Sequence, residues 1–452
     1  MLNTYKISPT VLFVTITALA AGELFSGTGL YFVAIMTATL ICIAITYNLL
    51  GGLGTFSGIL FAAFSLRTIV ISQFGKVLLL ESASTNLEVP LYTITIYMVF
   101  YFFVMLGVFI YGRISITLPK PLELTKGAQS DMLYAISLII GTTAAIAYAG
   151  TAQEHSIALR SFALGFQSLL VFSLVIAVDR QIKNTNGEHS FGMRAFISWM
   201  TLIVFAFLRT SRGQTLIPCI TYYACCFLRG YRFKRKHYLA AALGVIGFIY
   251  IISPVEIYSR YKVVGSTANE KTYEAFRLLF TTPDWKTVTD ASSEASESSA
   301  GRGTYFDHPG MFILSRLSLI GPDSTMFSAC SSGYHYGWTS FKNDILIQVP
   351  KYLYKDKPVQ DATGFTGRVT GLNPEDVENS YSALSPIADA FGSFGWWGVI
   401  AFSFLVMPMV FNYLDSMFDI RKPWGTAILG ILLETFSEGS MEDSLQKLSA
   451  FH

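Results

Sequence analysis

The sequence has few charged residues. Asp, Glu, Lys and Arg make up 14% of its 452 residues, whereas about 25% is usual for a globular protein. Hydrophobic residues account for 52%, and the mean hydropathy is +0.47. This composition excludes an ordinary soluble protein of two or three domains. Several apolar runs reach the roughly 20 residues that a helix needs to cross the hydrocarbon core. The sequence therefore predicts an all-α polytopic membrane protein.

Cysteine and the common nucleotide-binding and metal-binding motifs are also scarce. Of five cysteines, only Cys330 falls in the large polar segment, so neither a disulfide framework nor a zinc site is expected. The chain has no Walker A sequence and no Gly-x-Gly-x-x-Gly opening a helix after a strand, and the polar segment has no Asp-x-Asp. Nucleotide chemistry and metal-dependent glycosyl transfer are therefore unsupported. We expect no metal, no cofactor and no nucleic-acid partner.

The apolar runs predict about eleven transmembrane helices, within a range of ten to twelve. Their approximate ranges are 8–26, 29–49, 53–74, 90–112, 131–150, 160–178, 192–209, 213–229, 237–255, 392–414 and 423–437. The first run lacks an Ala-x-Ala-like cleavage site and is followed at once by another, which indicates a retained helix. The chain thus divides into residues 1–255 with nine helices, a large polar loop over 256–383, and C-terminal helices over 384–452.

The distribution of Lys and Arg predicts the orientation in the membrane, because these residues accumulate in cytoplasmic connections. Alternate connections carry thirteen of them: Arg113, Lys120, Lys126, Arg180, Lys183, Arg194, Arg229, Arg232, Lys234, Arg235, Lys236, Arg421 and Lys422. The intervening short connections carry four: Lys76, Arg160, Arg209 and Arg212. We therefore expect a cytoplasmic N-terminus and a loop 256–383 on the periplasmic side of a bacterial inner membrane.

The loop 256–383 contains most of the residue types that could perform chemistry. It carries fifteen acidic residues and twelve Lys or Arg. Residues 291–303 have the Ser, Glu and Gly composition of a solvated connector. On either side, apolar patterns predict helices over 272–280, 311–319 and 344–354. We expect the useful part, 307–358, to act as a lid over a site and not as a separate domain.

Arg209 and Arg212 lie in a very short connection between two predicted helices. Guanidinium groups three residues apart share one face if the turn is helical, and they suit a pyrophosphate. The alternative is that both arginines extend to lipid headgroups. Because positive charge is disfavoured on the outer face, the sequence favours a functional clamp.

Three further positions are candidates, each with a structural alternative. Arg316 lies in an apolar stretch and either faces a substrate or pairs with Asp307 or Asp323. The stretch 349–358 is basic and aromatic, which fits a glycolipid diphosphate or, equally, a strip resting on the membrane surface. Asp389 precedes a predicted helix in a nearly neutral stretch, which indicates either a functional site or a helix N-cap.

Three stretches, in the same order and topology, resemble the Wzy-type polymerases of O-antigen, enterobacterial common antigen and exopolysaccharide repeat units. They are Arg209-Thr-Ser-Arg-Gly213, Gln348-Val-Pro-Lys-Tyr-Leu-Tyr-Lys-Asp-Lys-Pro358 and Ser385-Pro-Ile-Ala-Asp-Ala-Phe-Gly-Ser-Phe-Gly-Trp-Trp-Gly398. About forty residues carry the resemblance. The sequence departs from the family near its end, where such polymerases usually continue through another apolar helix.

The resemblance implies a metal-independent glycosyltransferase that moves a glycan from undecaprenyl diphosphate onto a new lipid-linked repeat unit. Fixed cations would absorb the charge of the leaving group, and the acceptor hydroxyl would need a general base. The cation candidates are Arg209, Arg212, Arg316, Lys351 and Lys357, and the base candidates are Glu378, His308, Asp307 and His335. Further substrate contacts are assigned to Arg260, Arg277, Tyr352, Tyr354 and Asp389.

The implied partners are the lipid-linked donor and acceptor, the bilayer, a chain-length regulator and a flippase. Two alternatives stay open. An O-antigen ligase would have the same layout with a lipid A acceptor. A transporter of polysaccharide precursors would place its ionisable residues at mid-bilayer and in broken helices, whereas most cations of this chain fall at the outer interface and in the loop.

Overall fold

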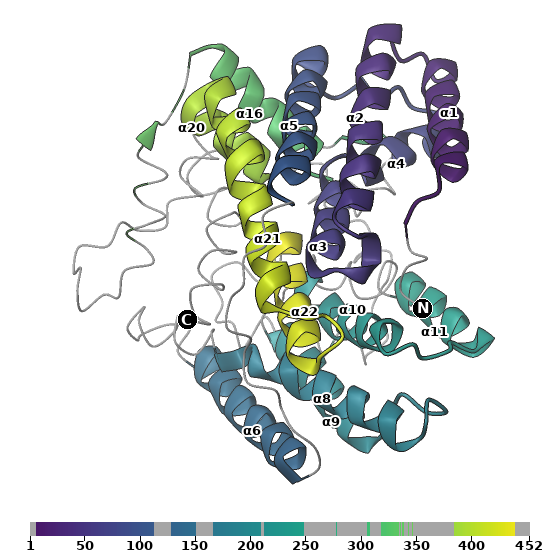
Figure 1. Cartoon of the computed structure of the whole chain (residues 1–452), viewed down its shortest axis with the longest axis vertical. Coiled ribbons are helices and arrows are strands. Elements are labelled where there is room, and N and C mark those ends of the chain that lie inside the picture. Colours follow the sequence, from purple (N-terminus) through teal and green to yellow (C-terminus); the bar gives the residue numbers. More distant parts are fainter. Residues whose placement is uncertain are drawn as a thin grey trace. The chain divides into compact units, whose positions relative to one another are not determined.

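The computed structural model describes most of the predicted helices and only parts of the loop. The described residues are 6–112, 128–150, 166–208, 212–247, 277, 305–307, 318–333, 335, 337–338, 342, 346 and 384–438. These residues form helices and connections without a strand, as expected for the all-α class (Figure 1). The chain forms two compact units. Unit 1 comprises 1–120, 299–417 and 435–452, and unit 2 comprises 121–298 and 418–434.

Unit 1 is built from helices that are far apart in sequence. Its elements are α1 (Pro9–Phe25), α2 (Leu30–Leu49), η2 (Gly52–Gly54), α3 (Phe56–Ser65), η3 (Leu66–Val70), α4 (Ile71–Leu79), α5 (Pro90–Tyr111), α16 (Ile320–Ser331), α20 (Pro386–Ala401), η6 (Phe402–Val406) and α21 (Met407–Met417). α1, α2 and α5 stand side by side, and α20 continues through η6 into α21 (Figure 1). The segments η3 and η6 are π-helical turns within these longer helices.

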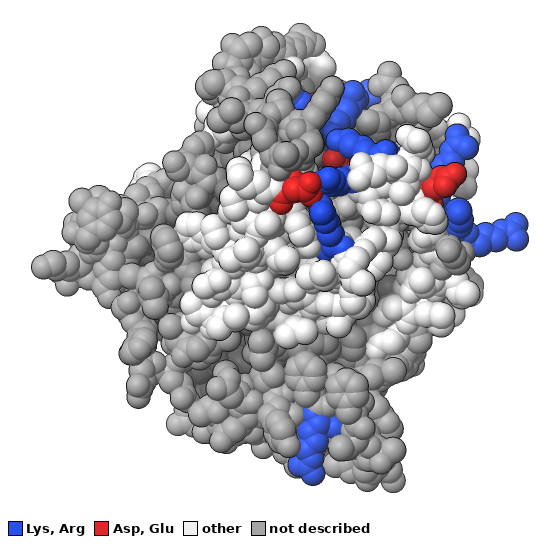
Figure 2. Space-filling model, turned by 90° about the horizontal axis from the view of Figure 1, so that it is seen from below, with Lys and Arg blue, Asp and Glu red and all other residues white. Residues whose placement is uncertain are grey.

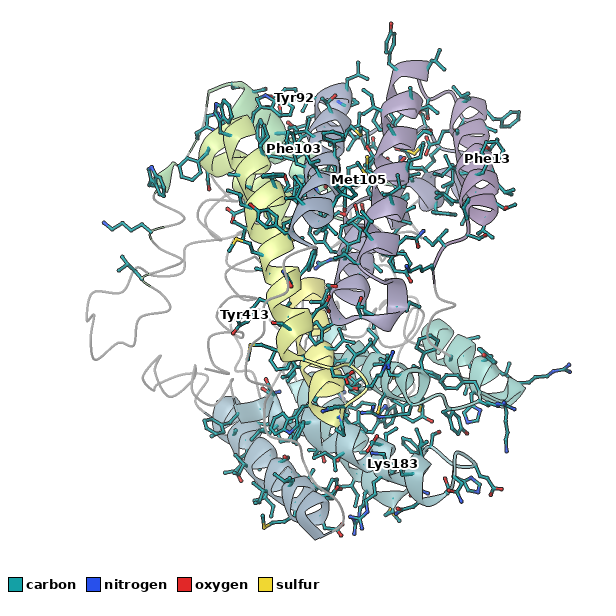
Figure 3. All side chains as sticks on the ribbon, in the orientation of Figure 1. Phe13, Tyr92, Phe103, Met105, Lys183 and Tyr413 are labelled. Atoms are coloured by element: carbon teal, nitrogen blue, oxygen red, sulfur yellow. The ribbon has the colours of Figure 1, made fainter. Side chains whose placement is uncertain are left out.

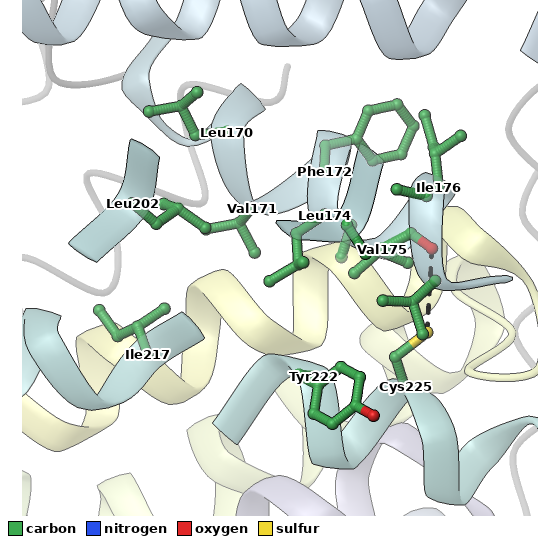
Figure 4. Packing of buried hydrophobic residues seen from close by; sticks show 14 of the residues in the cluster. Leu170, Val171, Phe172, Leu174, Val175, Ile176, Leu202, Ile217, Tyr222 and Cys225 are labelled. Atoms are coloured by element: carbon green, nitrogen blue, oxygen red, sulfur yellow. Dashed lines mark hydrogen bonds between the residues drawn. The ribbon is translucent and has the colours of Figure 1, made fainter. Parts of the chain in front are cut away.

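Unit 2 packs a smaller set of helices around an aliphatic core. Its elements are α6 (Ala128–Gly150), α8 (Leu169–Asn184), α9 (Met193–Leu208), α10 (Arg212–Leu228), α11 (Arg235–Gly247) and most of α22 (Pro423–Glu438). α8 supplies the centre of the core with Leu170, Leu174 and Val175, none of which is exposed (Figure 4). The Cys225 thiol of α10 donates to the Val175 carbonyl at 3.9 Å.

Five helical segments of the described residues are long and apolar enough to cross a membrane. They are Leu30–Gly54, Phe56–Leu79, Pro90–Tyr111, Ser130–Ala147 and Pro386–Met417. Four shorter apolar helices accompany them: Pro9–Phe25, Met193–Ala206, Ile217–Leu228 and Pro423–Leu432. The expectation of a helical, multi-pass membrane protein is thereby confirmed. The number of eleven spans, the orientation and the three predicted divisions of the chain stay predictions.

Two predicted helix ranges were misplaced, for reasons that the contacts explain. The helix expected over 160–178 ends later than predicted: α8 runs from Leu169 to Asn184, and residues 160–165 lie outside the described residues. It continues past the apolar run because Asp179 pairs with Lys183 one turn on at 2.7 Å and with Arg229, which directly follows α10, at 2.5 Å. The helix expected to start at residue 392 starts at Pro386, after its N-cap Ser385.

The loop helices were predicted with mixed success. Residue 277 is helical, and so is residue 346, within the expected ranges 272–280 and 344–354, of which the rest lies outside the described residues. Of the range 311–319, only Ser318 and Leu319 are described. They are not helical and immediately precede α16. Residues 311–317 lie outside the described residues, and the helix that the structure describes next, α16, covers Ile320–Ser331.

Within each unit, helix ends that the sequence assigns to the same side of the membrane contact one another. In unit 2, Asp131 at the start of α6 bonds Arg180 near the end of α8 and Arg194 at the start of α9. In unit 1, Asp415 near the end of α21 accepts from the Ser57 amide and hydroxyl at the start of α3. The predicted alternation of helix directions requires both groupings. In Figure 2, Lys and Arg lie beside Asp and Glu among the uncharged described residues of one face.

Candidate functional site

The opposite end of unit 1 carries the described loop residues 305–307, 318–333, 335 and 338. At this end α1 and α4 finish and α5 and α20 begin. The sequence predicts that it faces outward, and we refer to it as the outer end. Tyr92, in the first turn of α5, marks it in Figure 3. Polar side chains are buried here to an extent that the apolar sequence of the helices does not suggest.

Helix α16 is tied to the outer end through buried hydroxyl groups and a backbone contact. The Ser318 hydroxyl lies 2.6 Å from that of Ser72 in α4. The Leu319 amide donates to the carbonyl of Arg67 at 3.2 Å. The Ser324 hydroxyl accepts from Thr93 of α5 at 3.1 Å. Three helical segments of the bundle therefore hold this part of the loop in place.

Asp323 is the centre of the α16 contacts and is wholly buried. Its Oδ2 accepts from the Tyr97 hydroxyl of α5 at 2.5 Å and from the Ser385 hydroxyl, and its Oδ1 accepts from the Ser385 amide at 2.9 Å. Burial raises the pKa of Asp323 to about 6, although these three donors act in the opposite direction. The carboxylate thus joins the loop helix to the start of α20.

Ser385 connects this contact to the motif stretch 385–398. Its hydroxyl also accepts from the amides of Ile387 and Ala388, both at 3.2 Å, which satisfies two free donors of the first helical turn. The N-cap is therefore Ser385, and the alternative that Asp389 caps this helix is wrong. Asp389 is half-buried in the first turn, and its amide donates to the Ser385 carbonyl at 3.0 Å.

Helix α20 is interrupted at Phe394 and Gly395, where the backbone leaves helical geometry. Gly395 has a φ of 61°, which favours glycine. The loop contacts this break directly: Nδ1 of His335 lies 3.4 Å from the Gly392 carbonyl, and the Trp338 ring lies 4.8 Å from that of Phe394. Loop residues therefore contact the first half of α20 at both of its ends, at Ser385 and near the break at Phe394.

A second loop segment, Tyr305 to Asp307, is held by the connection between α4 and α5. The Tyr305 hydroxyl donates to the Ala83 carbonyl at 2.7 Å. Asn86 donates to Oδ1 of Asp307 at 2.6 Å, and the Asp307 amide donates to Glu81 at 3.0 Å. These contacts attach residues 305–307 of the loop to the connection between α4 and α5.

Lys76 provides the charge of this second contact region. Its side chain is 0% exposed, and its Nζ lies 2.8 Å from Oε2 of Glu81 and 3.9 Å from Oδ2 of Asp307. The ammonium also lies 4.7 Å from the centre of the Tyr305 ring, a cation–π distance. Lys76 was expected in a short outer connection. It lies instead within α4, because the helix continues to Leu79.

The predicted site residues fall into three groups. Asp307, His335 and Asp389 lie at the outer end of unit 1. Arg212 is the first residue of α10, and Arg277 is helical and exposed; both belong to unit 2. The others lie outside the described residues: Arg209, Arg260, His308, Arg316, Lys351, Tyr352, Tyr354, Lys357 and Glu378. The arginine clamp therefore stays a prediction.

Sequence reasoning did not single out several residues of the outer end. Asp323 entered only as a potential partner of Arg316, which lies outside the described residues, and its oxygens bond Tyr97 and Ser385. Glu23 and Glu81 were not considered. A usable signal existed for the pair of Lys76 and Glu81, since an isolated cation in an apolar helix with a carboxylate five residues later favours a buried ion pair.

The outer end thus offers ionisable groups of two kinds. Asp323 and Lys76 are wholly buried and hold the loop, whereas the side chain of Asp307 is 57% exposed and Asp389 is half-buried. The described residues contain no group of three or more His, Cys, Asp and Glu that could hold a metal ion. Comparisons with family models, curated proteins and solved structures find no match for this chain.

Proposed function

We propose that this protein is a polymerase that joins oligosaccharide repeat units carried on undecaprenyl diphosphate, at the periplasmic face of a bacterial inner membrane. The proposal rests on the order and topology of the three motif stretches. The structural observation that best supports it is the contact of Asp323 with Ser385. This contact links the large loop to the first residue of the third motif stretch.

The proposed reaction needs a base and several cations. The acceptor hydroxyl forms a bond to the anomeric carbon of the donor, while the bond from this carbon to the diphosphate breaks and its electron pair stays on the diphosphate. The hydroxyl proton passes to a base, for which Glu378, His308, Asp307 and His335 are candidates. Arg209, Arg212, Arg316, Lys351 and Lys357 are the proposed cations, since guanidinium and ammonium groups stabilise a departing diphosphate.

The contact at Asp323 has a natural control at the other end of unit 1. There Asp415 accepts from the amide and hydroxyl of Ser57, just as Asp323 accepts from those of Ser385. Both carboxylates hold a serine near a helix start, so loss of either should destabilise the bundle to a similar degree. Only the pair at the outer end is proposed to position the loop for the reaction.

The test compares D323N and S385A with D415N and S57A in the native host, at matched protein levels. Surface glycan is resolved on a gel. We expect D323N and S385A to shorten the long-chain ladder and leave single repeats attached, and D415N and S57A to keep a ladder at equal protein level. R209A, R212A and R316A are expected to abolish the ladder. Loss of all attached glycan would favour a ligase or a flippase, and a normal ladder in all variants would refute the proposal.

A further inference from the structure

Glu23 is a wholly buried carboxyl group in the last turn of α1, at the outer end of unit 1. Its Oε2 accepts from the Thr28 hydroxyl at 2.9 Å. Its Oε1 has no hydrogen-bond partner among the described residues. An ionised carboxylate that is buried with one oxygen unsatisfied is strongly disfavoured, and such groups neutralise instead.

The nearby charges do not compensate an ionised Glu23. Among the described residues, the cation that acts on Glu23 is Lys76 of α4. It donates to Glu81 at 2.8 Å and to Thr85 at 3.0 Å, and it lies 3.9 Å from Asp307. Two carboxylates therefore already accompany this single ammonium group. An ionised Glu23 would add a third negative charge.

The other elements around Glu23 contribute phenols and no cation among the described residues. Burial raises the pKa of Tyr305 well above its ordinary value, and the neighbouring Glu23 charge raises it further. α2 also packs along α1, and its ionisable residue at this end, Tyr31, is 80% exposed. Neither phenol can neutralise a carboxylate.

Glu23 is connected to the loop by a short chain of hydrogen bonds. The Thr28 hydroxyl that bonds Glu23 accepts from the Ala83 amide at 3.0 Å. The Ala83 carbonyl in turn accepts from the Tyr305 hydroxyl at 2.7 Å. A change in the charge of Glu23 therefore acts on Ala83, the residue whose carbonyl binds Tyr305.

We propose that Glu23 is a proton-binding site, whose bound proton keeps Tyr305 to Asp307 attached to the outer end of unit 1. Loss of the proton places an uncompensated charge beside the pair of Lys76 and Glu81. Water must then enter to solvate that charge, which opens the contact between Ala83 and Tyr305. This inference does not depend on the proposed polymerase activity.

The first test detects the proton directly. Infrared spectra of the purified full-length protein at pH 7 should contain the carbonyl band of a protonated carboxylic acid. The band should lose the intensity of one carboxyl group in E23Q, and E88Q is the control because Glu88 is exposed in the connection between α4 and α5. The proposal is overturned if wild type lacks the band or if E23Q retains all of it. The wild-type spectrum alone can refute it if E23Q does not fold.

The second test measures attachment of the loop. Trypsin should cleave wild type and E88Q within 256–383 faster as the pH rises above neutrality. The ratio of the cleavage rate of E23Q to that of E88Q should therefore fall as the pH rises. Equal pH dependence in E23Q and wild type would overturn the coupling. A third outcome would indicate that Glu23 binds a metal cation and not a proton. In that case wild type would lack the acid band, and sodium would raise the thermal midpoint of wild type but not that of E23Q.

Discussion

Asp323 shows how one side chain can hold two parts of a membrane protein together. A carboxylate without neighbours would be expelled from an apolar interior, yet this one is retained by three donors, two of them from Ser385. Its partners lie 226 residues before it and 62 residues after it. Removing its charge therefore affects the position of α16 and of α20 together.

The raised pKa of Asp323 predicts that stability falls with rising pH in the mildly acidic range. The folded state binds this proton with a pKa of about 6, against 3.8 for the ordinary group. Folding is therefore penalised as the pH rises from about 4 to about 6, by roughly 3 kcal/mol in all, and the penalty is constant above that. Thermal unfolding of the detergent-solubilised protein at pH 4, 5, 6 and 7 measures it.

D323N is the control for this prediction, because it removes the titrating group at the same position. The thermal midpoint of wild type relative to D323N should be highest near pH 4 and decline to a plateau above pH 6. A difference that is independent of pH, or that increases between pH 4 and pH 6, would contradict the assignment.

At the scale of helices, α5 lies very close to η6 and α21 at Gly107. A Cβ atom added to Gly107 would lie 2.6 Å from the Phe404 carbonyl oxygen and 2.6 Å from Cγ of Pro408. Backbone and a proline ring cannot move aside as a flexible side chain would. Pro408 also has no amide hydrogen to donate back to the Phe404 carbonyl. Glycine at position 107 is therefore what allows these helices to meet.

We expect G107A to lower the free energy of unfolding by about 1–3 kcal/mol, since overpacking forces the helices apart. Gly244, in the middle of α11, is the matched control because a Cβ there meets nothing within 4 Å. G244A should be neutral or stabilising by up to about 1 kcal/mol. Thermal midpoints of both variants against wild type measure the effect, and equal midpoints for the two would refute this packing argument.

Helix positions could be predicted from the sequence because they follow from long apolar runs. The start of α20 could not, since it depends on Ser385, whose cap is completed by Asp323 from another segment. The extension of α8 depends in the same way on Arg229. Contacts between residues that lie tens to hundreds of positions apart leave no periodic signal, which is why the buried contacts at the outer end were not predicted.

At the scale of the whole chain, the alternation of helix directions predicts which connections can be reached from outside the cell membrane. Glu88 and Glu188 are exposed in connections that the sequence assigns to opposite sides. The native cysteines favour this test, because four are buried and Cys219 is half-buried.

We expect a membrane-impermeant maleimide to label E88C in spheroplasts and to label E188C only after permeabilisation. Simultaneous labelling of wild type provides the background. The reverse pattern would invert the predicted orientation, and labelling of both variants in intact spheroplasts would contradict the alternation itself.

The discontinuous make-up of unit 1 has a consequence for the order of synthesis. Residues 121–298 of unit 2 are translated between the first and second segments of unit 1. At 5–20 residues per second, a ribosome needs roughly 10–35 s for that stretch. Glu81 reaches Lys76 almost at once, but Tyr305 and Asp307 arrive only after this delay. During this time the Lys76 ammonium group of the nascent chain can pair with Glu81, but it still lacks the loop residues that cover it in the finished protein.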